Sequence, residues 1–182
     1  SGLRSYRCGR HRRCGRCGQP LRLLPCGDRG RSLVAVMSLI HGTCIAIGSC
    51  GVLLRGASGS GKSDLALRLL GRTYLDARLV ADDQIQLSRR GTELWARAPA
   101  SIAGLLEVRG VGIVRLDALE EARLRLILDL SDAADVPRMP EAATCTIDGV
   151  DLPLYPCAPF DASAPDKVAL LVRALDEDIL RS

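Results

Sequence analysis

The stretch "LLRGASGSGKSDLALRLL", residues 53–70, passes from an apolar run through a glycine-rich turn into a helical pattern. Gly56, four further residues, Gly61, Lys62 and Ser63 match the spacing of a phosphate-binding loop. The apolar run before the loop predicts a strand, and the leucines after it recur at helical intervals. This strand–loop–helix context favours a nucleotide-phosphate site over a chance glycine-rich turn.

The lysine of this loop has a role that arginine cannot fill. The chain has 25 basic residues, and only Lys62 and Lys167 among them are lysines. A compact ammonium reaches phosphate oxygens inside such a loop, whereas the planar guanidinium is too broad. Backbone N–H groups and the start of the next helix add positive charge, and a serine hydroxyl can bind Mg²⁺. The predicted nucleotide-binding residues are Gly56, Ala57, Ser58, Gly59, Ser60, Gly61, Lys62 and Ser63.

Charge is distributed unevenly along the chain. The net charge is +4, but residues 1–37 contain nine arginines and one aspartate, so the remainder is acidic. We expect residues 1–36 to be an extension that does not fold or that precedes the true start at Met37, and residues 37–182 to form one catalytic domain. Cys14 and Cys17 form a C-x-x-C pair, so a zinc knuckle, a nucleic-acid arm and a transit-like segment remain alternatives for the extension.

The sequence gives no sign of a membrane partner. The apolar stretch 33–47 follows basic residues as a signal peptide does, but His41 and Gly42 interrupt it and it runs into the strand of the phosphate loop. The later cysteines show no paired spacing, which is typical of a reducing compartment. We therefore expect a cytoplasmic protein with no membrane partner and, because the folded part is acidic, no nucleic-acid partner.

The remaining pattern predicts short strands joined by tight turns. Asp148–Gly149 indicates a hairpin turn, and Ser163 with Pro165 indicates the start of a final helix. The other predicted elements are strands at 43–47, 52–55 and 77–83, a strand–turn–strand at 85–99, a buried strand at 123–132, and a helix at 63–70. This pattern predicts a mixed α/β domain with hairpins, unlike the strictly alternating βαβ of a doubly wound kinase.

Two adjacent carboxylates follow the predicted strand 77–83. Asp82 and Asp83 lie downstream of the loop, where P-loop enzymes place a metal-binding aspartate. Neighbouring side chains on an extended chain point in opposite directions, so one can face the nucleophile while the other anchors a neighbouring loop. The alternative is a solvated strand end with turn-forming aspartates. With the phosphate loop upstream, we expect a catalytic role for at least one of them.

In order, "HGTCIAIG" (41–48), the phosphate loop, "RLVADD" (78–83) and "GLLEVRGVGIV" (104–114) resemble the catalytic domain of HPr kinase/phosphorylase, the bacterial protein-serine kinase of the phosphotransferase system. The segment "LLEVRGVGI" looks like the signature of this family, which other P-loop proteins lack. The resemblance covers roughly residues 39–138. The chain is similar to the short alphaproteobacterial form of the family rather than to members with an extra N-terminal domain.

The resemblance implies a P-loop fold of the HPr kinase and phosphoenolpyruvate carboxykinase type, ATP and Mg²⁺ as cofactors, HPr as the partner, and a homohexamer. It implies that Ser63 and Glu107 bind Mg²⁺. One of the two aspartates would deprotonate the acceptor serine, and the sequence offset slightly favours Asp83. Arg138, in "VPRMP", resembles the family's active-site arginine. The implied catalytic residues are His41, Lys62, Asp82, Asp83, Arg109 and Arg138. Without the signature, His41 would be a strand-edge histidine and Arg109 a surface ion-pair partner.

The predicted activity is therefore an ATP- and Mg²⁺-dependent protein-serine kinase that acts on HPr. Larger members carry a proline- and arginine-rich loop near the C-terminus, associated with phosphorolysis of the phosphoserine. The matching segment 152–165 keeps prolines but lacks arginine, so we expect kinase activity alone or predominantly. The alternatives are a small-molecule P-loop kinase and a non-catalytic nucleotide sensor. A GTPase is disfavoured because no N-K-x-D motif occurs.

Overall fold

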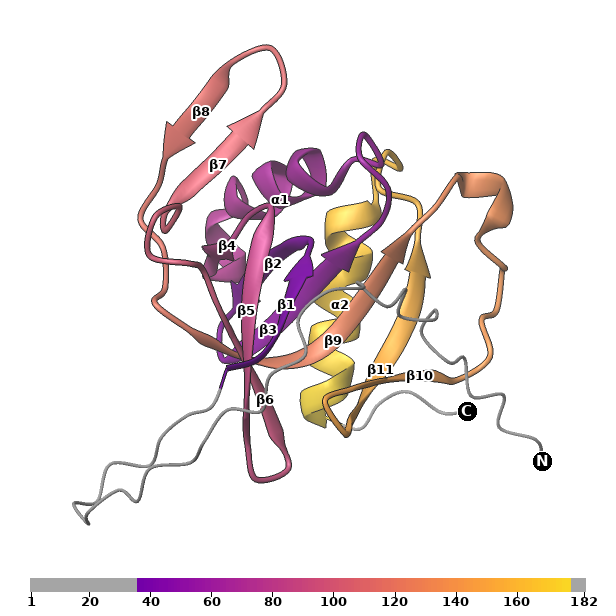
Figure 1. Ribbon diagram of the computed structural model, residues 1–182. Coiled ribbons are helices and arrows are strands. Elements are labelled where there is room, and N and C mark those ends of the chain that lie inside the picture. The colour runs from indigo at the N-terminus through magenta and orange to yellow at the C-terminus, as the bar shows by residue number, and fades with distance from the viewer. Residues whose placement is uncertain (1–35, 178–182) are drawn as a thin grey trace, which may run out of the picture.

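The computed structural model describes residues 36–177 (Figure 1). Its α-helices are α1 (Lys62–Leu70) and α2 (Ala164–Glu177). Its strands are β1 (Val36–His41), β2 (Thr43–Ile47), β3 (Cys50–Arg55), β4 (Ala77–Ala81), β5 (Gln84–Arg90), β6 (Glu93–Arg97), β7 (Leu105–Val108), β8 (Gly112–Arg115), β9 (Ala122–Leu130), β10 (Ala143–Ile147) and β11 (Val150–Cys157). The extension expected at 1–36 lies outside the described residues, except for Val36 at the start of β1.

Nine strands form one branched, mixed sheet. Its main path runs β1-β5-β6-β9-β3-β2-β4, and the β10–β11 hairpin joins through β11. The first half of β9 pairs with β6, and its second half pairs in parallel with β11. Strand β3 is the other parallel neighbour of β9. The remaining pairs in this sheet are antiparallel, so the predicted mixed sheet with hairpins is confirmed.

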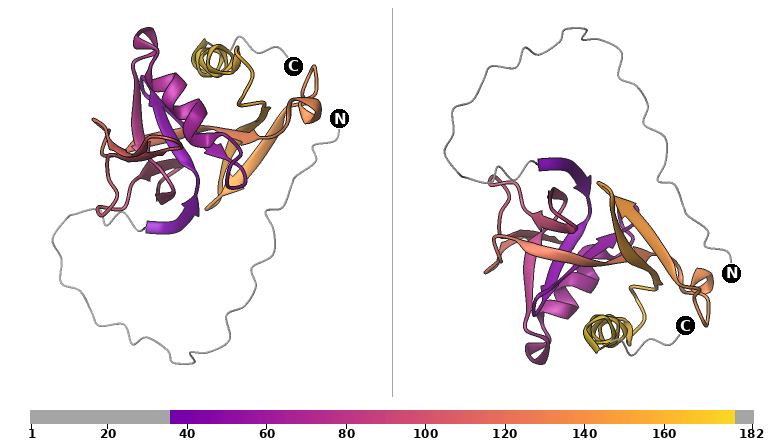
Figure 2. Two further views of the ribbon diagram at one scale, coloured as in Figure 1. Left: turned by 90° about the horizontal axis from the view of Figure 1, so that it is seen from above. Right: turned by 90° about the horizontal axis from the view of Figure 1, so that it is seen from below.

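Two apolar cores lie on opposite faces of the central strands. Successive side chains of a strand point to opposite faces, so Leu54 packs into one core while Leu53 packs into the other. Both α1 and α2 bury apolar residues in the first core, with Leu65 and Val168 among them (Figure 2). Strand β3 is therefore covered on both sides and holds the phosphate loop at its end on a rigid base.

Two features of the fold were not predicted. The apolar stretch 33–47 contains an edge strand, β1, which pairs with β5 and is separated from β2 by Gly42. A Cβ at Gly42 would lie 2.9 Å from the carbonyl oxygen of Leu54, so the turn into β2 needs glycine. The second feature is a separate hairpin, β7–β8, which carries the signature motif and projects beyond α1 (Figure 1).

In the part of the chain that the structure describes, neither helix could cross a membrane. They contain 9 and 14 residues, and neither is long and apolar enough for a span.

Candidate active site

The glycine-rich segment between β3 and α1 forms a closed loop around its lysine. Gly59 and Gly61 have φ angles of +81° and +91°, which residues with a Cβ rarely adopt. Lys62 is the first residue of α1 and is nearly buried, and its Nζ donates hydrogen bonds to the carbonyl oxygens of Gly56 and Ala57, both at 2.9 Å. The ammonium is thus held inside the turn, where it can meet a phosphate.

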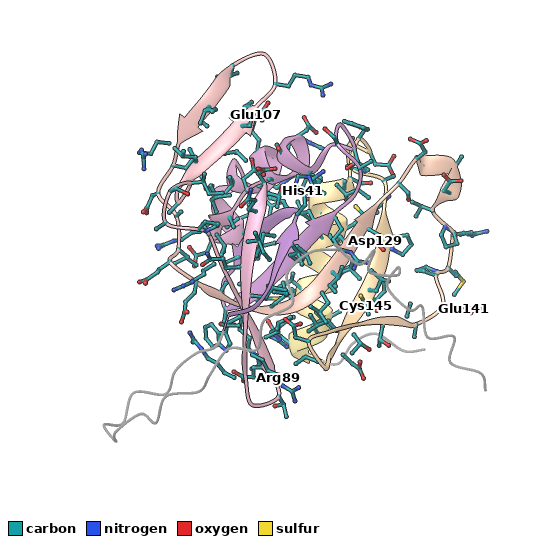
Figure 3. All side chains as sticks on the ribbon, viewed as in Figure 1. His41, Arg89, Glu107, Asp129, Glu141 and Cys145 are labelled. Atoms are coloured by element: carbon teal, nitrogen blue, oxygen red, sulfur yellow. The ribbon has the colours of Figure 1, made fainter. Side chains whose placement is uncertain are left out.

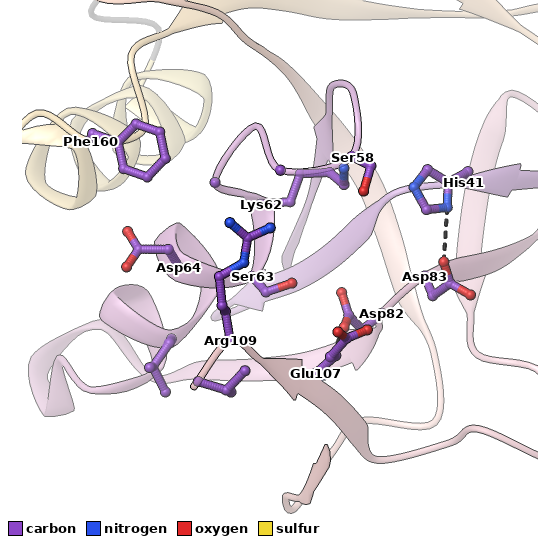
Figure 4. A pocket seen from close by; sticks show the side chains of 14 residues that line it. His41, Ser58, Lys62, Ser63, Asp64, Asp82, Asp83, Glu107, Arg109 and Phe160 are labelled. Atoms are coloured by element: carbon purple, nitrogen blue, oxygen red, sulfur yellow. Dashed lines mark hydrogen bonds and ion pairs between the residues drawn. The ribbon is translucent and has the colours of Figure 1, made fainter. Parts of the chain in front are cut away.

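A pocket of about 450 Å³ opens beside this loop (Figure 4). Its volume is in the range of small-molecule sites. It is lined by His41, Ser58, Gly59, Gly61, Lys62, Ser63, Asp64, Leu67, Asp82, Asp83, Glu107, Val108, Arg109 and Phe160. Four separate parts of the sequence therefore meet the phosphate loop in one place.

The two adjacent aspartates have different surroundings. Asp82 is 8% exposed, and both of its carboxylate oxygens accept hydrogen bonds: Oδ1 from the hydroxyl of Thr43 at 2.7 Å and Oδ2 from the backbone N–H of Glu107 at 3.1 Å. It thereby ties β2 to the signature hairpin. The side chain of Asp83 is 66% exposed and reaches the pocket. Both aspartates line the pocket, but only Asp82 has the anchoring contacts expected of one of them, and the cause of this difference is not the predicted one. Strand β4 ends at Ala81, and Asp83 has a φ of +69°, so the pair does not belong to an extended chain.

The carboxylate of Asp83 pairs with an imidazole. Its Oδ1 lies 3.0 Å from Nδ1 of His41, the last residue of β1 (Figure 4). The His41 side chain is 57% exposed, so the pair is accessible from the pocket. The backbone N–H of Gly42 also donates to the carbonyl of Asp83 at 3.2 Å, which fixes the two residues relative to each other.

The signature hairpin supplies a carboxylate and a guanidinium to the same pocket. Glu107 on β7 lies beside Asp82, and the guanidinium of Arg109 points toward the phosphate loop (Figure 4). A Cβ at Gly59 would lie 3.7 Å from Nη2 of Arg109, so this guanidinium stands close to the loop. Within residues 36–177, no carboxylate lies within ion-pair distance of Arg109. Its side chain is therefore available to a bound anion.

The oxygen-bearing side chains around the loop fit a magnesium ion that is held mainly by phosphates. Among the described residues, no group of three or more histidine, cysteine or acidic side chains could hold a metal by itself. Ser63 and Glu107 do line the pocket together with the two aspartates. Mg²⁺ typically takes one or two carboxylates and completes its shell with phosphate oxygens and water. These residues match that requirement.

Some residues singled out from the sequence lie elsewhere. Gly56, Ala57 and Ser60 form the base of the loop and do not line the pocket, and the Ser60 hydroxyl is buried without a partner. Arg138 is exposed in the loop 131–142 between β9 and β10, outside the pocket. Figure 3 shows Glu141, from the same loop, well away from His41 and Glu107. The role of Arg138 stays a prediction.

An arginine–aspartate pair supports the base of the loop. Arg55, the last residue of β3, donates from Nε and Nη2 to the two carboxylate oxygens of Asp129 on β9 at 2.7 and 2.8 Å. Its Nη1 also lies 3.3 Å from Sγ of Cys145. The hydrogen bonds that Arg55 donates to Asp129 raise the pKa of Arg55 above its usual value. This forked pair fixes the strand end that leads into Gly56. It was not predicted from the sequence.

Four other residues that line the pocket were not predicted from the sequence. Asp64 and Leu67 follow the loop on α1, Val108 follows Glu107, and Phe160 comes from the turn before α2. A usable signal existed for Phe160, because it is the single phenylalanine of the chain and stands in a proline-rich turn.

The fold and the loop together define a P-loop kinase-like domain. A sequence profile described as the HPr Serine kinase C-terminal domain matches residues 32–135, which is more than half of the chain. The chain belongs to this family.

Individual relatives agree with this assignment. A protein of Exiguobacterium sp., called HPr kinase/phosphorylase, is 44% identical over 82 residues, covering 44% of this chain and 25% of the relative. A protein of the same name from Burkholderia lata is 34% identical over 152 residues, covering 78% of this chain and 46% of the relative. The chain thus matches a quarter to a half of the length of these relatives.

A solved structure shares the fold. It is described as the HPr(Ser) kinase/phosphatase from Coxiella burnetii and aligns with a TM-score of 0.68 at 25% identity. The alignment covers 78% of this chain and 92% of that one. The predicted fold of the HPr kinase type is confirmed.

Proposed function

We propose that this chain is an ATP- and Mg²⁺-dependent protein kinase that phosphorylates a serine of HPr. The observation that carries the proposal is the exposed His41–Asp83 pair in the same pocket as the phosphate loop. A phosphate-binding loop alone indicates only a ligand. A carboxylate that is accessible and oriented by an imidazole adds a group that can accept a proton from a hydroxyl.

The roles of the residues follow from their surroundings. Lys62 and the loop N–H groups bind the phosphates, and Asp83 accepts the proton of the acceptor serine as its oxygen attacks the terminal phosphorus. The bond between that phosphorus and the ADP oxygen breaks in the same transfer. Asp82 is less suited to be the base because both of its oxygens already accept hydrogen bonds.

Two further side chains complete the proposed site. Arg109 is free of carboxylate partners in the described part of the chain and stands near the loop, so it can stabilise charge on the transferring group. A magnesium ion, held by Ser63 and Glu107, would supply charge neutralisation at the phosphates when bound. His41 holds the carboxylate of Asp83 toward the pocket.

The proposal includes a homohexamer in the cytoplasm and a reaction that runs mainly in the kinase direction. The described cysteines at 44, 50, 145 and 157 are free and buried, which fits a reducing compartment. The basic side chains that line the pocket are His41, Lys62 and Arg109, and the segment 152–165 adds none. Few positive charges are thus available for a second free anion.

Incubation with ATP, Mg²⁺ and HPr from the same source tests the proposal, with phosphoserine detected by mass spectrometry. Lys62→Ala should abolish transfer and keep the fold. Lys167→Ala is the matched control, because the other lysine pairs with Asp161 outside the pocket. Absence of phosphoserine under every metal condition would contradict the proposal. Nucleotide binding without transfer would instead indicate a nucleotide sensor, and transfer to a metabolite would indicate a small-molecule kinase.

A further inference from the structure

The pocket has two chemically different ends. In Figure 4, His41 and Asp83 stand at one end and Phe160 stands at the other, with Lys62 and Ser63 between them. Lysine in a phosphate-binding loop reaches the β- and γ-phosphates. If the proposed function holds, the terminal phosphate of the bound nucleotide points toward the His41–Asp83 pair. The nucleoside part then extends past Asp64 toward Phe160.

The second end of the pocket carries an accessible aromatic ring. The Phe160 side chain is 69% exposed although it lines the pocket. Leu67, one helical turn after Ser63 on α1, is also exposed and lines the pocket. Exposed apolar side chains beside a polar loop indicate a contact surface for a ligand that has an apolar face.

The Phe160 ring is held against the phosphate loop. A Cβ at Gly61 would lie 2.9 Å from Cζ of Phe160 and 3.1 Å from the ring of Pro159. The ring therefore fits only because position 61 lacks a side chain. This contact places the Cζ–Cε1 edge of the ring next to Gly61, the residue that precedes Lys62.

A single arginine fixes the backbone on both sides of Phe160. Arg68 on α1 donates from Nη1 to the carbonyl of Asp161 at 3.1 Å, and from Nη2 to the carbonyl of Pro159. It also forms an ion pair with Asp64 at 2.9 Å. The turn before α2 is thereby attached to the helix that follows the phosphate loop. Phe160 is an exposed side chain on a fixed backbone, which lowers the cost of ordering it around a ligand.

We propose that Phe160 is the platform on which the base of the bound nucleotide stacks, and that Arg68 is a positioning residue for it. Aromatic rings bind nucleobases by stacking, since every base has a π-face. The phosphate loop then holds the phosphates, while Phe160, beside Gly61, holds the base. The phosphate loop and Phe160 would together bind both parts of the nucleotide.

Inorganic tripolyphosphate separates these two contributions, because it carries the phosphates of ATP without a base. We would measure the binding of both ligands, each with Mg²⁺, to the full chain by calorimetry. Phe160→Ala should weaken ATP binding about 5- to 150-fold and leave tripolyphosphate binding unchanged. Arg68→Met should produce a smaller loss with the same selectivity for ATP. Leu170→Ala is the control, since Leu170 is an exposed apolar residue of α2 outside the pocket.

A second variant reports on stacking directly. Phe160→Trp should retain ATP affinity, and its indole fluorescence should be quenched by ATP but not by tripolyphosphate. The chain's own tryptophan, Trp95 on β6, does not line the pocket and serves as the background signal.

The outcomes are distinguishable. Equal weakening of both ligands by Phe160→Ala would show that the ring only supports the loop, and no change for either ligand would also overturn the proposal. If the unmodified chain bound neither ligand, nucleotide binding itself, and with it the proposed function, would fail. Tight binding of ATP with unchanged affinity in Phe160→Ala would refute only the stacking platform.

Discussion

Nδ1 of His41 lies 3.0 Å from Oδ1 of Asp83, and both side chains remain accessible from the phosphate-loop pocket. The neighbouring Asp82 is nearly buried, with both oxygens accepting hydrogen bonds from other elements. Two identical side chains in consecutive positions are therefore suited to different tasks. Asp83 can exchange a proton with a ligand, whereas Asp82 holds the site together.

Because of this difference, we expect Asp83→Asn to affect mainly the reaction rate and Asp82→Asn to affect mainly the stability of the fold. Asp83→Asn should lower the rate of phosphoryl transfer about 10²- to 10⁴-fold, because the proposed general base is lost. Its melting temperature should hardly change, since the side chain is exposed. Asp82→Asn should lower the free energy of unfolding by about 1–3 kcal/mol, because an amide cannot accept from both donors. Steady-state kinetics and thermal unfolding of both variants check this, and a stable Asp82→Asn with a larger rate defect would reverse the assignment.

Glu107→Gln tests the proposed magnesium ligand. The side chain keeps its shape and loses its charge, while the backbone N–H that holds Asp82 is unaffected. We expect the Mg²⁺ concentration for half-maximal activity to rise at least about tenfold, and the defect to shrink at high Mg²⁺. Glu141→Gln is the matched control, because Glu141 is an exposed glutamate of the loop 131–142 outside the pocket. A defect in Glu107→Gln that is indifferent to metal would count against ligation.

The phosphate loop could be predicted from the sequence because all its parts lie within eight consecutive residues. Spacing alone defines the glycines, the lysine and the serine, and the flanking periodicities define the strand and the helix. The hairpins at 43–55 and 145–156 were predicted for the same reason, since turn residues stand between two strand-like runs.

The arrangement around the loop depends on contacts that sequence patterns do not contain. Asp82 binds Thr43 and Glu107, which come from β2 and β7, and no local pattern links them. The edge strand β1 was overlooked because its apolar residues follow a basic segment, as they do in a signal peptide. Phe160 lies against the loop in a turn that Arg68, 92 positions earlier in the sequence, holds by hydrogen bonds to the carbonyls of Pro159 and Asp161. Such long-range pairings follow from topology rather than from local periodicity.

Glu121 gives a pH-dependent contribution to stability that is independent of the active site. Arg90 donates to both of its carboxylate oxygens at 2.8 and 2.6 Å and also stacks on Trp95. These hydrogen bonds lower the pKa of Glu121. A group whose pKa is lower in the folded state contributes stability above its unfolded pKa, and loses it as the pH falls through the folded value.

We therefore expect Glu121→Gln to lower the free energy of unfolding by about 1 kcal/mol at pH 7, since the pair is only partly exposed. The difference from the unmodified chain should persist down to about pH 4.3, the usual pKa of glutamate, and shrink below it. Denaturant titrations from pH 7 to pH 3 measure this. Glu120→Gln is the control, because the adjacent Glu120 forms no ion pair with another described residue. A difference that stayed constant down to pH 3 would show that the ion pair is not its cause.

The direction of the reaction is the last expectation. Phosphorolysis requires inorganic phosphate beside the departing phosphoryl group, and a second anion next to a charged site needs positive side chains. The segment 152–165 contains no arginine, lysine or histidine. Of this segment, Phe160 lines the pocket. Charge-assisted hydrogen bonds contribute about 1.5–3 kcal/mol each, so the absence of even one should slow the step about tenfold or more. Phosphoserine-HPr incubated with Mg²⁺ and phosphate should therefore lose its phosphate at least about tenfold more slowly than HPr is phosphorylated at matched concentrations. Equal rates in both directions would show that another group, with Arg109 and Arg138 as the residues to substitute next, binds the phosphate.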